Sequence, residues 1–176
     1  KIEIDRIGHN NFYLSGTMMH NGQIEFDCGD TLENFNEVKF LSDYKNYNYH
    51  DFQGSTWAPH LIHKNLWNKV GGFSEEFYPG TGSDPDLNMK LFKEGIKIFK
   101  GVNDFKVYHF GSITTRKKKN FTLNRGDKIF LKKWGITTKF FKKHYLKSRT
   151  KYNGPLSEPK VSFIYIIGLI ICKIKF

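Results

Sequence analysis

The chain has 176 residues, a length that suits one domain of ordinary size. Its hydrophobic share of 39% and aromatic share of 16% are enough to form a buried core, which argues against the disordered, collagen-like and coiled-coil classes. Its two cysteines, Cys28 and Cys172, are too few for a disulfide framework or a four-cysteine zinc site. We therefore expect a folded protein of the cytoplasm.

The net charge of +11 is distributed unevenly along the chain. Residues 1–110 carry 11 Lys and Arg against 15 Asp and Glu, a net charge of −4, whereas residues 111–176 carry 17 against 2, a net charge of +15. Such a pattern predicts an acidic or neutral body joined to a basic segment that can meet phosphate, anionic lipid or another polyanion.

The first part of the chain predicts short strands and helices. Strands are expected at Phe12–Met19 and Gln23–Asp27, on either side of a turn. A helix is expected at Thr31–Tyr44, because a Thr can cap it and apolar residues recur at helical spacing. A second helix is expected at His60–Val70, where a Gly pair follows it.

A loop rich in Pro and Gly then leads into a helix with an acidic start. Pro85 fits the first helical position, where its missing N–H has no partner to lose. This placement makes Asp84 the N-cap and Asp86 a first-turn acid, and Gly95 is expected to end the helix.

The second half of the chain predicts two more strands and then a basic helical region. The strands are expected at Ile96–Phe99 and Phe105–Tyr108. A basic loop at Arg116–Lys119 precedes helices expected at about Asn124–Trp134 and Thr137–Lys147.

The C-terminal segment Val161–Cys172 is almost entirely apolar. As a helix it would be about 18 Å long, which is shorter than the hydrocarbon core of a membrane, about 30 Å. We therefore expect no transmembrane span here. Since Lys173 and Lys175 follow, the segment suits a membrane interface as well as it suits buried packing.

Several motifs occur in a distinctive order. They are Val70-Gly71-Gly72-Phe73-Ser74-Glu75-Glu76-Phe77, Ser83-Asp84-Pro85-Asp86-Leu87, Val107-Tyr108-His109-Phe110-Gly111-Ser112 and Lys132-Lys133-Trp134-Gly135. In type, order and spacing these motifs resemble those of family 2 glycosyltransferases of the GT-A fold. The resemblance covers residues 10–147, and it is most specific between Trp57 and Ser112.

The resemblance implies a partial GT-A domain of the α/β class with short mixed strands. Residues 1–115 would be its acceptor-side half, 116–150 a basic helical extension, and 151–176 a linker with an apolar helix. The family's donor-binding half, with its Asp-x-Asp metal motif, is expected to precede this part in a longer enzyme. On its own, the chain is expected to be inactive.

The implied activity is transfer of a sugar from a nucleotide sugar to a glycan or lipid-linked acceptor, with inversion and with Mn²⁺ or Mg²⁺ as cofactor. The resemblance gives Asp84 the role of the catalytic base and His109 that of a metal ligand. At position 83 this sequence has Ser where the family usually has Glu. We assign Ser83 and Asp86 to substrate binding. Trp57, beside small residues, is suited to stacking on an acceptor sugar.

Each of these residues also has an ordinary structural interpretation. Asp84 is a typical helix cap, and Asp86 a typical partner of the helix dipole. Trp57 is equally suited to a buried core, and His109 to a structural role. His60 and His63 lie three apart on the expected helix, like half of a zinc site, but no third ligand is apparent and we expect no zinc.

The basic segment supports two other classes of function. Its lysines alternate with aromatic residues, a pattern that can bind RNA through charge and stacking. No recognised nucleic-acid motif accompanies this pattern, so we do not expect nucleic acid as the main partner. The positive charge is also compatible with a peripheral membrane contact. A noncatalytic glycan-binding remnant is the remaining alternative.

Overall fold

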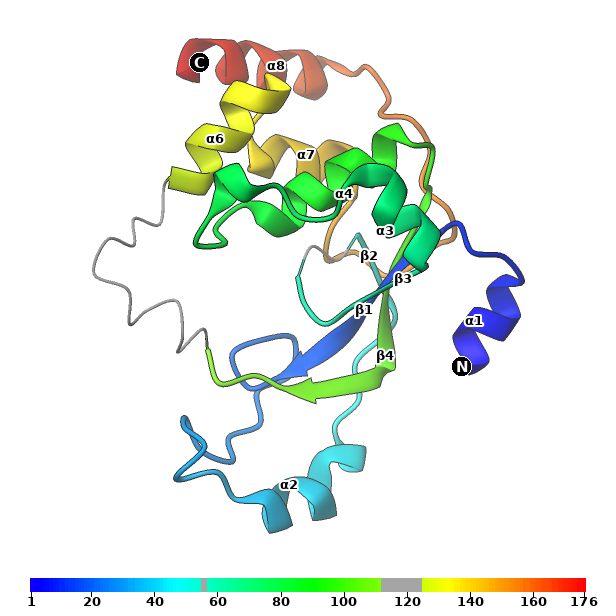
Figure 1. Ribbon diagram of the computed structural model, residues 1–176, viewed down its shortest axis with the longest axis vertical. Coiled ribbons are helices and arrows are strands. Elements are labelled where there is room, and N and C mark those ends of the chain that lie inside the picture. The colour runs from blue at the N-terminus through cyan, green and yellow to red at the C-terminus, as the bar shows by residue number, and fades with distance from the viewer. Residues whose placement is uncertain (55–56, 112–124) are drawn as a thin grey trace.

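The computed structural model describes residues 1–54, 57–111 and 125–176, and the expected basic loop at 116–119 lies outside these ranges. The described residues form a mixed α/β structure, as expected, with seven α-helices and a four-stranded sheet (Figure 1). The strand order is β2 (Phe52–Gln53), β4 (Ile98–Tyr108), β1 (Phe12–Met19) and β3 (His60–Ile62). The central pair β1 and β4 is parallel, and both edge strands are antiparallel to their neighbours.

The central pair of strands contains the longest pairing in the sheet. The expected strand at Phe12–Met19 is confirmed, whereas the two strands expected between residues 96 and 108 are one continuous strand, β4. Its register against β1 shifts between Gly16 and Thr17. A Cβ at Gly16 would lie 2.7 Å from the Phe105 carbonyl oxygen, so the close approach at this irregularity requires glycine.

The helices are gathered mainly at one end of the molecule. Figure 1 shows α3, α4, α6, α7 and α8 on one side of the sheet and α2 at the opposite end. The α-helices are α1 (Ile2–Ile7), α2 (Glu37–Asp43), α3 (Lys64–Val70), α4 (Ser83–Lys93), α6 (Arg125–Trp134), α7 (Thr138–His144) and α8 (Phe163–Lys175), and η1 (Tyr44–Asn46) and η2 (Glu75–Phe77) are 3₁₀ turns.

One helix and one strand in the first part of the chain are shorter than the sequence predicted. The helix expected from Thr31 begins only at Glu37, because Asn36 caps it by accepting a hydrogen bond from the Lys39 N–H at 2.9 Å. Before it, the Asn34 side chain accepts from the Thr31 N–H and holds a turn. The strand expected at Gln23–Asp27 is reduced to an isolated bridge between Met19 and Ile24.

The expected helix at His60–Val70 divides into two elements. His60 begins strand β3 and pairs with Ser15 of β1, whereas His63 caps the shorter helix α3. The two histidines therefore do not share a helical face, which removes the basis for a zinc half-site.

Helix α4 begins earlier than the sequence suggested. Its N-cap is Gly82, and Asp84 and Pro85 both lie within its first turn, so the assignment of Asp84 as the N-cap is wrong. Pro85 is tolerated there because the first-turn N–H groups have no intrahelical acceptor. Gly95 follows the end of the helix, as expected, with φ of 85° in the left-handed region.

One large core joins the sheet to α4, α6 and α7. Tyr13, Leu87, Phe99, Phe130 and Phe141 are among its fully buried members. The two helices expected in the basic region are confirmed as α6 and α7. They are basic on the outside, but their aromatic residues pack in the same core as the sheet.

The apolar C-terminal segment is helical, as expected. Helix α8 is capped by Ser162, whose hydroxyl accepts a hydrogen bond from the Tyr165 N–H at 3.2 Å. Of the residues of α8, Cys172 alone is fully buried. Among the helices of the described ranges, none has the length and apolar character needed to cross a membrane.

Candidate functional site

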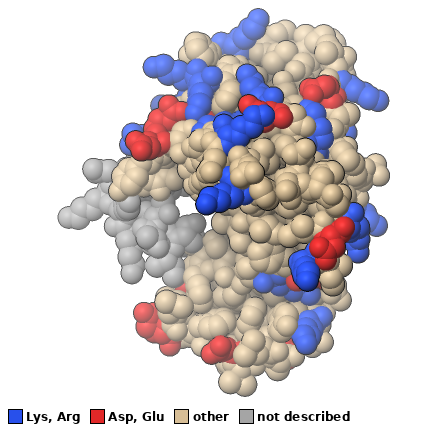
Figure 2. Space-filling view, turned by 45° about the vertical axis from the view of Figure 1, so that its right-hand side comes forward, with Lys and Arg blue, Asp and Glu red and all other residues tan. Residues whose placement is uncertain are grey.

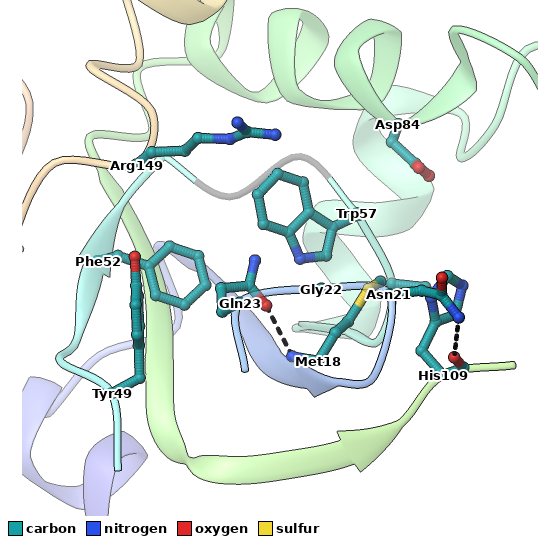
Figure 3. Close-up of a pocket in the computed structure, with 11 residues that line it drawn as sticks. Met18, Asn21, Gly22, Gln23, Tyr49, Phe52, Trp57, Asp84, His109 and Arg149 are labelled. Carbon is teal, nitrogen blue, oxygen red and sulfur yellow. Dashed lines mark hydrogen bonds between the residues drawn. The ribbon is translucent and has the colours of Figure 1, made fainter. Parts of the chain in front are cut away.

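A pocket of about 600 Å³ lies where β1 and β4 end (Figure 3). Because these two strands are parallel, their carboxyl ends reach the same edge of the sheet, which is the common position for ligand sites in α/β proteins. The turn after β1 and the residue after β4 both contribute to its wall. The lining residues are Met18, Asn21, Gly22, Gln23, Tyr49, Phe52, Trp57, Ala58, Asp84, His109 and Arg149.

Three residues selected from the sequence meet in this pocket. Asp84 comes from the first turn of α4, Trp57 from the segment before β3, and His109 from the residue after β4. Figure 3 shows the Trp57 ring near the middle of the view, with Asp84 and His109 to its right. The fold therefore brings together three side chains that are widely separated in the sequence.

Asp84 is held by a histidine that the sequence did not identify as its partner. His60 Nε2 lies 3.1 Å from Asp84 Oδ1. The His60 side chain is only 12% exposed, whereas that of Asp84 is 34% exposed. The carboxylate is thus oriented from the protein side and remains open to the pocket.

A buried tyrosine fixes the other side of the His60 ring. The Tyr13 hydroxyl is hydrogen-bonded to His60 Nδ1, and Tyr13 is fully buried. Burial raises the pKa of Tyr13 far above its usual range, so the side chain is a neutral phenol. If the phenol donates to Nδ1, the His60 proton resides on Nε2 and is donated to Asp84. We therefore assign Tyr13 as the donor to His60, and His60 as the donor to Asp84.

Two polar atoms of the pocket residues have no hydrogen-bond partner among residues 1–54, 57–111 and 125–176. Trp57 Nε1 and His109 Nδ1 are buried and accept or donate no hydrogen bond among the described residues. Such atoms are rare in folded proteins, and an ordered water, an ion or a ligand can satisfy them. The Trp57 ring is held by stacking on Phe52, with ring centroids 6.0 Å apart. The His109 backbone is held by its N–H, which donates to the Met19 carbonyl at 2.9 Å.

The pocket residues fit a metal only in part. Among the described residues there is no group of three or more His, Cys, Asp or Glu side chains that could hold a metal ion. His109 fits the role of one ligand, because its Nδ1 is unpartnered within the described chain. Any further ligands would have to come from the bound molecule or from elsewhere in the protein.

Arg149 is a pocket residue that no sequence motif indicated. It has φ of 71°, and its N–H donates to the Gln53 carbonyl at 3.2 Å. The neighbouring Ser148 hydroxyl donates to the Gly54 carbonyl at 2.6 Å. These contacts fix a segment distant in sequence beside the pocket, and Figure 3 shows the guanidinium extending over it. A positive charge therefore lies on the same pocket as the Asp84 carboxylate.

Ser83 and Asp86, expected to bind substrate, do not line the pocket. The Ser83 hydroxyl donates to the Gly80 carbonyl at 2.6 Å and so closes the turn before α4. Asp86 has no exposed surface, which rules out direct contact with an acceptor in this structure. Its assignment to substrate binding is corrected on that ground, and the alternative structural role applies.

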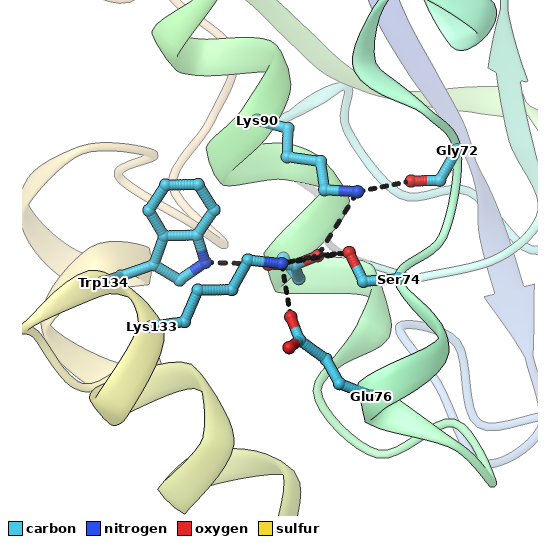
Figure 4. Close-up of polar contacts among 7 residues, drawn as sticks. Gly72, Ser74, Glu76, Lys90, Lys133 and Trp134 are labelled. Atoms are coloured by element: carbon cyan, nitrogen blue, oxygen red, sulfur yellow. Dashed lines mark hydrogen bonds and ion pairs between the residues drawn. The ribbon is translucent and has the colours of Figure 1, made fainter.

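Asp86 is the centre of a buried polar cluster (Figure 4). Its Oδ1 accepts from Trp134 Nε1 at 2.8 Å and lies 3.0 Å from Lys133 Nζ, and its Oδ2 accepts from the Ser74 hydroxyl at 2.7 Å. Lys133 also pairs with Glu76 at 2.6 Å. Burial disfavours the charged Lys133, but its hydrogen bonds to Glu76 and Asp86 outweigh that effect and raise its pKa. This Asp86 cluster connects α4, α6 and the turn around η2.

Comparison of the chain with protein-family models, curated proteins and solved structures gives no match. The chemistry of the pocket is therefore inferred from its own residues. These residues supply a carboxylate oriented by a histidine, an indole, an imidazole and a guanidinium.

Proposed function

We propose that the chain is the acceptor-side part of an inverting, GT-A type glycosyltransferase. The full-length enzyme would transfer a sugar from a nucleotide sugar to a glycan or lipid-linked acceptor. The observation that carries the proposal is the meeting of Asp84, Trp57 and His109 in one pocket of about 600 Å³. These residues were selected from the sequence for proton removal, sugar stacking and metal binding, and they come from separate segments.

Inverting transfer requires a base that removes the proton of the acceptor hydroxyl as its oxygen attacks the anomeric carbon. We assign this role to Asp84. Its Oδ1 is engaged by His60, which leaves Oδ2 to receive the proton. With a side chain that is 34% exposed, Asp84 is accessible to an acceptor that enters from the pocket.

Trp57 would bind the acceptor sugar through the apolar face of its ring. Its partly buried position against Phe52 fixes the indole, so little conformational entropy is lost on binding.

When Mn²⁺ or Mg²⁺ is bound with the donor, it would offset the charge that develops on the departing diphosphate. His109 would be the ligand that this part of the chain supplies. The donor-binding half would lie N-terminal to Lys1 in the full-length protein, and the 176-residue chain alone would not transfer sugar. Two free, buried cysteines are compatible with a cytoplasmic location for this activity.

The proposal is tested with a chain extended N-terminally to include the preceding coding sequence. This protein is incubated with a mixture of nucleotide sugars and acceptor glycans, with Mn²⁺ or with a chelator. We expect a glycosylated product of inverted anomeric configuration that depends on the cation. Failure to consume any donor, combined with glycan binding by the 176-residue chain, would instead indicate a noncatalytic glycan-binding module.

The nucleic-acid alternative receives less support from the aromatic residues of the basic region. Phe130, Phe140 and Phe141 are buried in the core and are not available to stack on bases. Nucleic-acid binding that weakens steeply with salt and needs no divalent cation would nevertheless favour that alternative.

A further inference from the structure

We propose that the outward face of α8 docks on an anionic lipid membrane surface. This inference does not depend on the proposed transferase activity, because it concerns a different part of the molecule. It rests on the exposure of apolar side chains, on the charge around them and on the position of α8 in the fold.

Helix α8 is apolar on nearly all sides, but the protein covers only one of them. Cys172 is buried, and Tyr165 and Leu169 are partly packed against the core. The remaining large side chains of this segment are exposed: Val161 75%, Phe163 78%, Ile164 62%, Ile166 46%, Ile167 41%, Ile170 52%, Ile171 47%, Ile174 78% and Phe176 75%. A contiguous apolar surface of this kind is unusual in a monomer and marks an interaction site.

The charged residues of the C-terminal segment itself all have one sign. Residues 159–176 contain no Asp or Glu, and Lys173 and Lys175 lie in the last turn of α8. Upstream, Lys160 precedes the helix. Figure 2 shows many Lys and Arg side chains, with some Asp and Glu among them, over the upper part of the view, which is the end where α8 lies.

A groove of about 800 Å³ places further lysines beside the same isoleucines. It runs between α8 and the helices α6 and α7, and its lining includes Ile164, Ile167 and Ile171 together with Lys128, Lys139, Lys143 and Lys175. The acid of the lining, Asp127, accepts a hydrogen bond from the Thr138 hydroxyl at 2.6 Å. The lining of the groove thus combines apolar side chains with four lysines.

This combination matches the chemistry of an anionic bilayer surface. The acyl region accepts isoleucine and phenylalanine side chains without a specific shape, while lysines at the level of the headgroups attract anionic lipid. A second copy of the chain is a poorer occupant, because its own α8 would bring like charges together. In Figure 1, α8 lies at one extreme of the longest axis, so a flat surface can reach it without obstruction by the sheet.

The test is co-flotation of the 176-residue chain with vesicles of phosphatidylcholine, alone or mixed with phosphatidylglycerol. We expect stronger binding to the mixed vesicles, and weaker binding at high salt because salt screens the lysines. The double variant Ile170→Asp/Ile174→Asp should lose at least roughly tenfold in vesicle affinity, and Lys173→Glu/Lys175→Glu should lose selectivity for anionic lipid. All these residues are exposed, so circular dichroism should show an unchanged fold.

The matched control is Val38→Asp/Leu41→Asp on α2, where two apolar side chains are 81% and 58% exposed at the opposite end of the molecule. This control should bind vesicles like the wild type. Equal binding to uncharged vesicles, or an equal loss in the control, would overturn the proposal. The proposal would also be overturned if the wild type bound no vesicles and formed a dimer in solution that the Ile170→Asp/Ile174→Asp substitutions dissociate.

Discussion

Asp84 accepts a hydrogen bond from His60, with Oδ1 and Nε2 3.1 Å apart, although the two residues are 24 positions apart in the chain. The contact is made because the first residue of β3 lies beside the start of α4, where Asp84 lines the pocket. Behind His60, the buried Tyr13 hydroxyl holds the far ring nitrogen. We therefore interpret His60 as a positioning residue for the proposed base.

Substitution His60→Ala should lower kcat/KM of the extended enzyme roughly tenfold, because it removes one hydrogen bond to a charged group. His60→Gln should retain more activity, since its amide can still donate to Asp84. The measurement is transfer rate as a function of pH, because a change in the environment of Asp84 alters the profile. The matched control is His63→Ala, at the N-cap of α3, which should leave the profile unchanged. A His60→Ala enzyme with a wild-type rate and pH profile would show that His60 does not position the base.

Removal of the buried carboxylate of Asp86 should destabilise the fold. Asp86→Ala leaves the Trp134 N–H, Lys133 and Ser74 without their shared acceptor. We expect a loss of about 3 kcal/mol in the free energy of unfolding, measured by urea denaturation, because the donors packed around this buried carboxylate lose their acceptor.

The control for this prediction is Glu76→Gln, which alters the exposed end of the same cluster. The Glu76 side chain is 50% exposed, so its ion pair with Lys133 should contribute little. Equal effects of the two substitutions would contradict the assignment of Asp86 as the centre of the cluster.

The pairing of Asp51 with Lys100 makes stability depend on pH. Burial alone would raise the pKa of Asp51, but hydrogen bonds from Lys100 and from the Asn103 N–H, together with the Lys100 charge, lower it below the ordinary value. A depressed folded-state pKa stabilises the protein above the unfolded pKa of about 3.9, and this contribution is lost as pH falls through the folded value.

Asp51→Asn should therefore lower the free energy of unfolding at neutral pH, and the difference from wild type should shrink as pH falls below about 4. The effect should be smaller than that of Asp86→Ala, because the Asp51 side chain is 35% exposed and solvent screens it. Unfolding titrations across this range, with the exposed Asp5→Asn as control, provide the test. A difference that is independent of pH would contradict the proposed origin of the effect.

Local sequence patterns predicted most elements of the fold but not their limits. Strand β1, the helices of the basic region and the apolar C-terminal helix follow from hydrophobic spacing and capping residues. Residues 31–36 were expected to be helical and are not, because Asn34 and Asn36 form local side-chain hydrogen bonds that compete with helical structure. His60 was placed in a helix because three-residue strands leave almost no periodic signal; pairing with β1 decides its structure.

The motifs that suggested the family divide into two groups in space. Asp84 and His109 line the pocket, whereas Ser74, Glu76 and Asp86, with the Lys133–Trp134 pair, form the buried Asp86 cluster. The sequence alone does not separate these groups, because Asp84 and Asp86 differ only by a rotation around one helix. Arg149 and the Tyr13–His60 contact were missed, since they depend on long-range packing and follow no local pattern.

The most direct test of the central claim is the rate of sugar transfer by the extended enzyme carrying Asp84→Asn, compared with wild type and with Ser83→Ala. Ser83 is adjacent to Asp84 but does not line the pocket, so its substitution controls for disturbance of the start of α4. If Asp84 is the base, the asparagine variant should fold normally, bind the acceptor and transfer sugar at least about 10²-fold more slowly, while Ser83→Ala stays near the wild-type rate. Equal rates for Asp84→Asn and wild type would contradict the account.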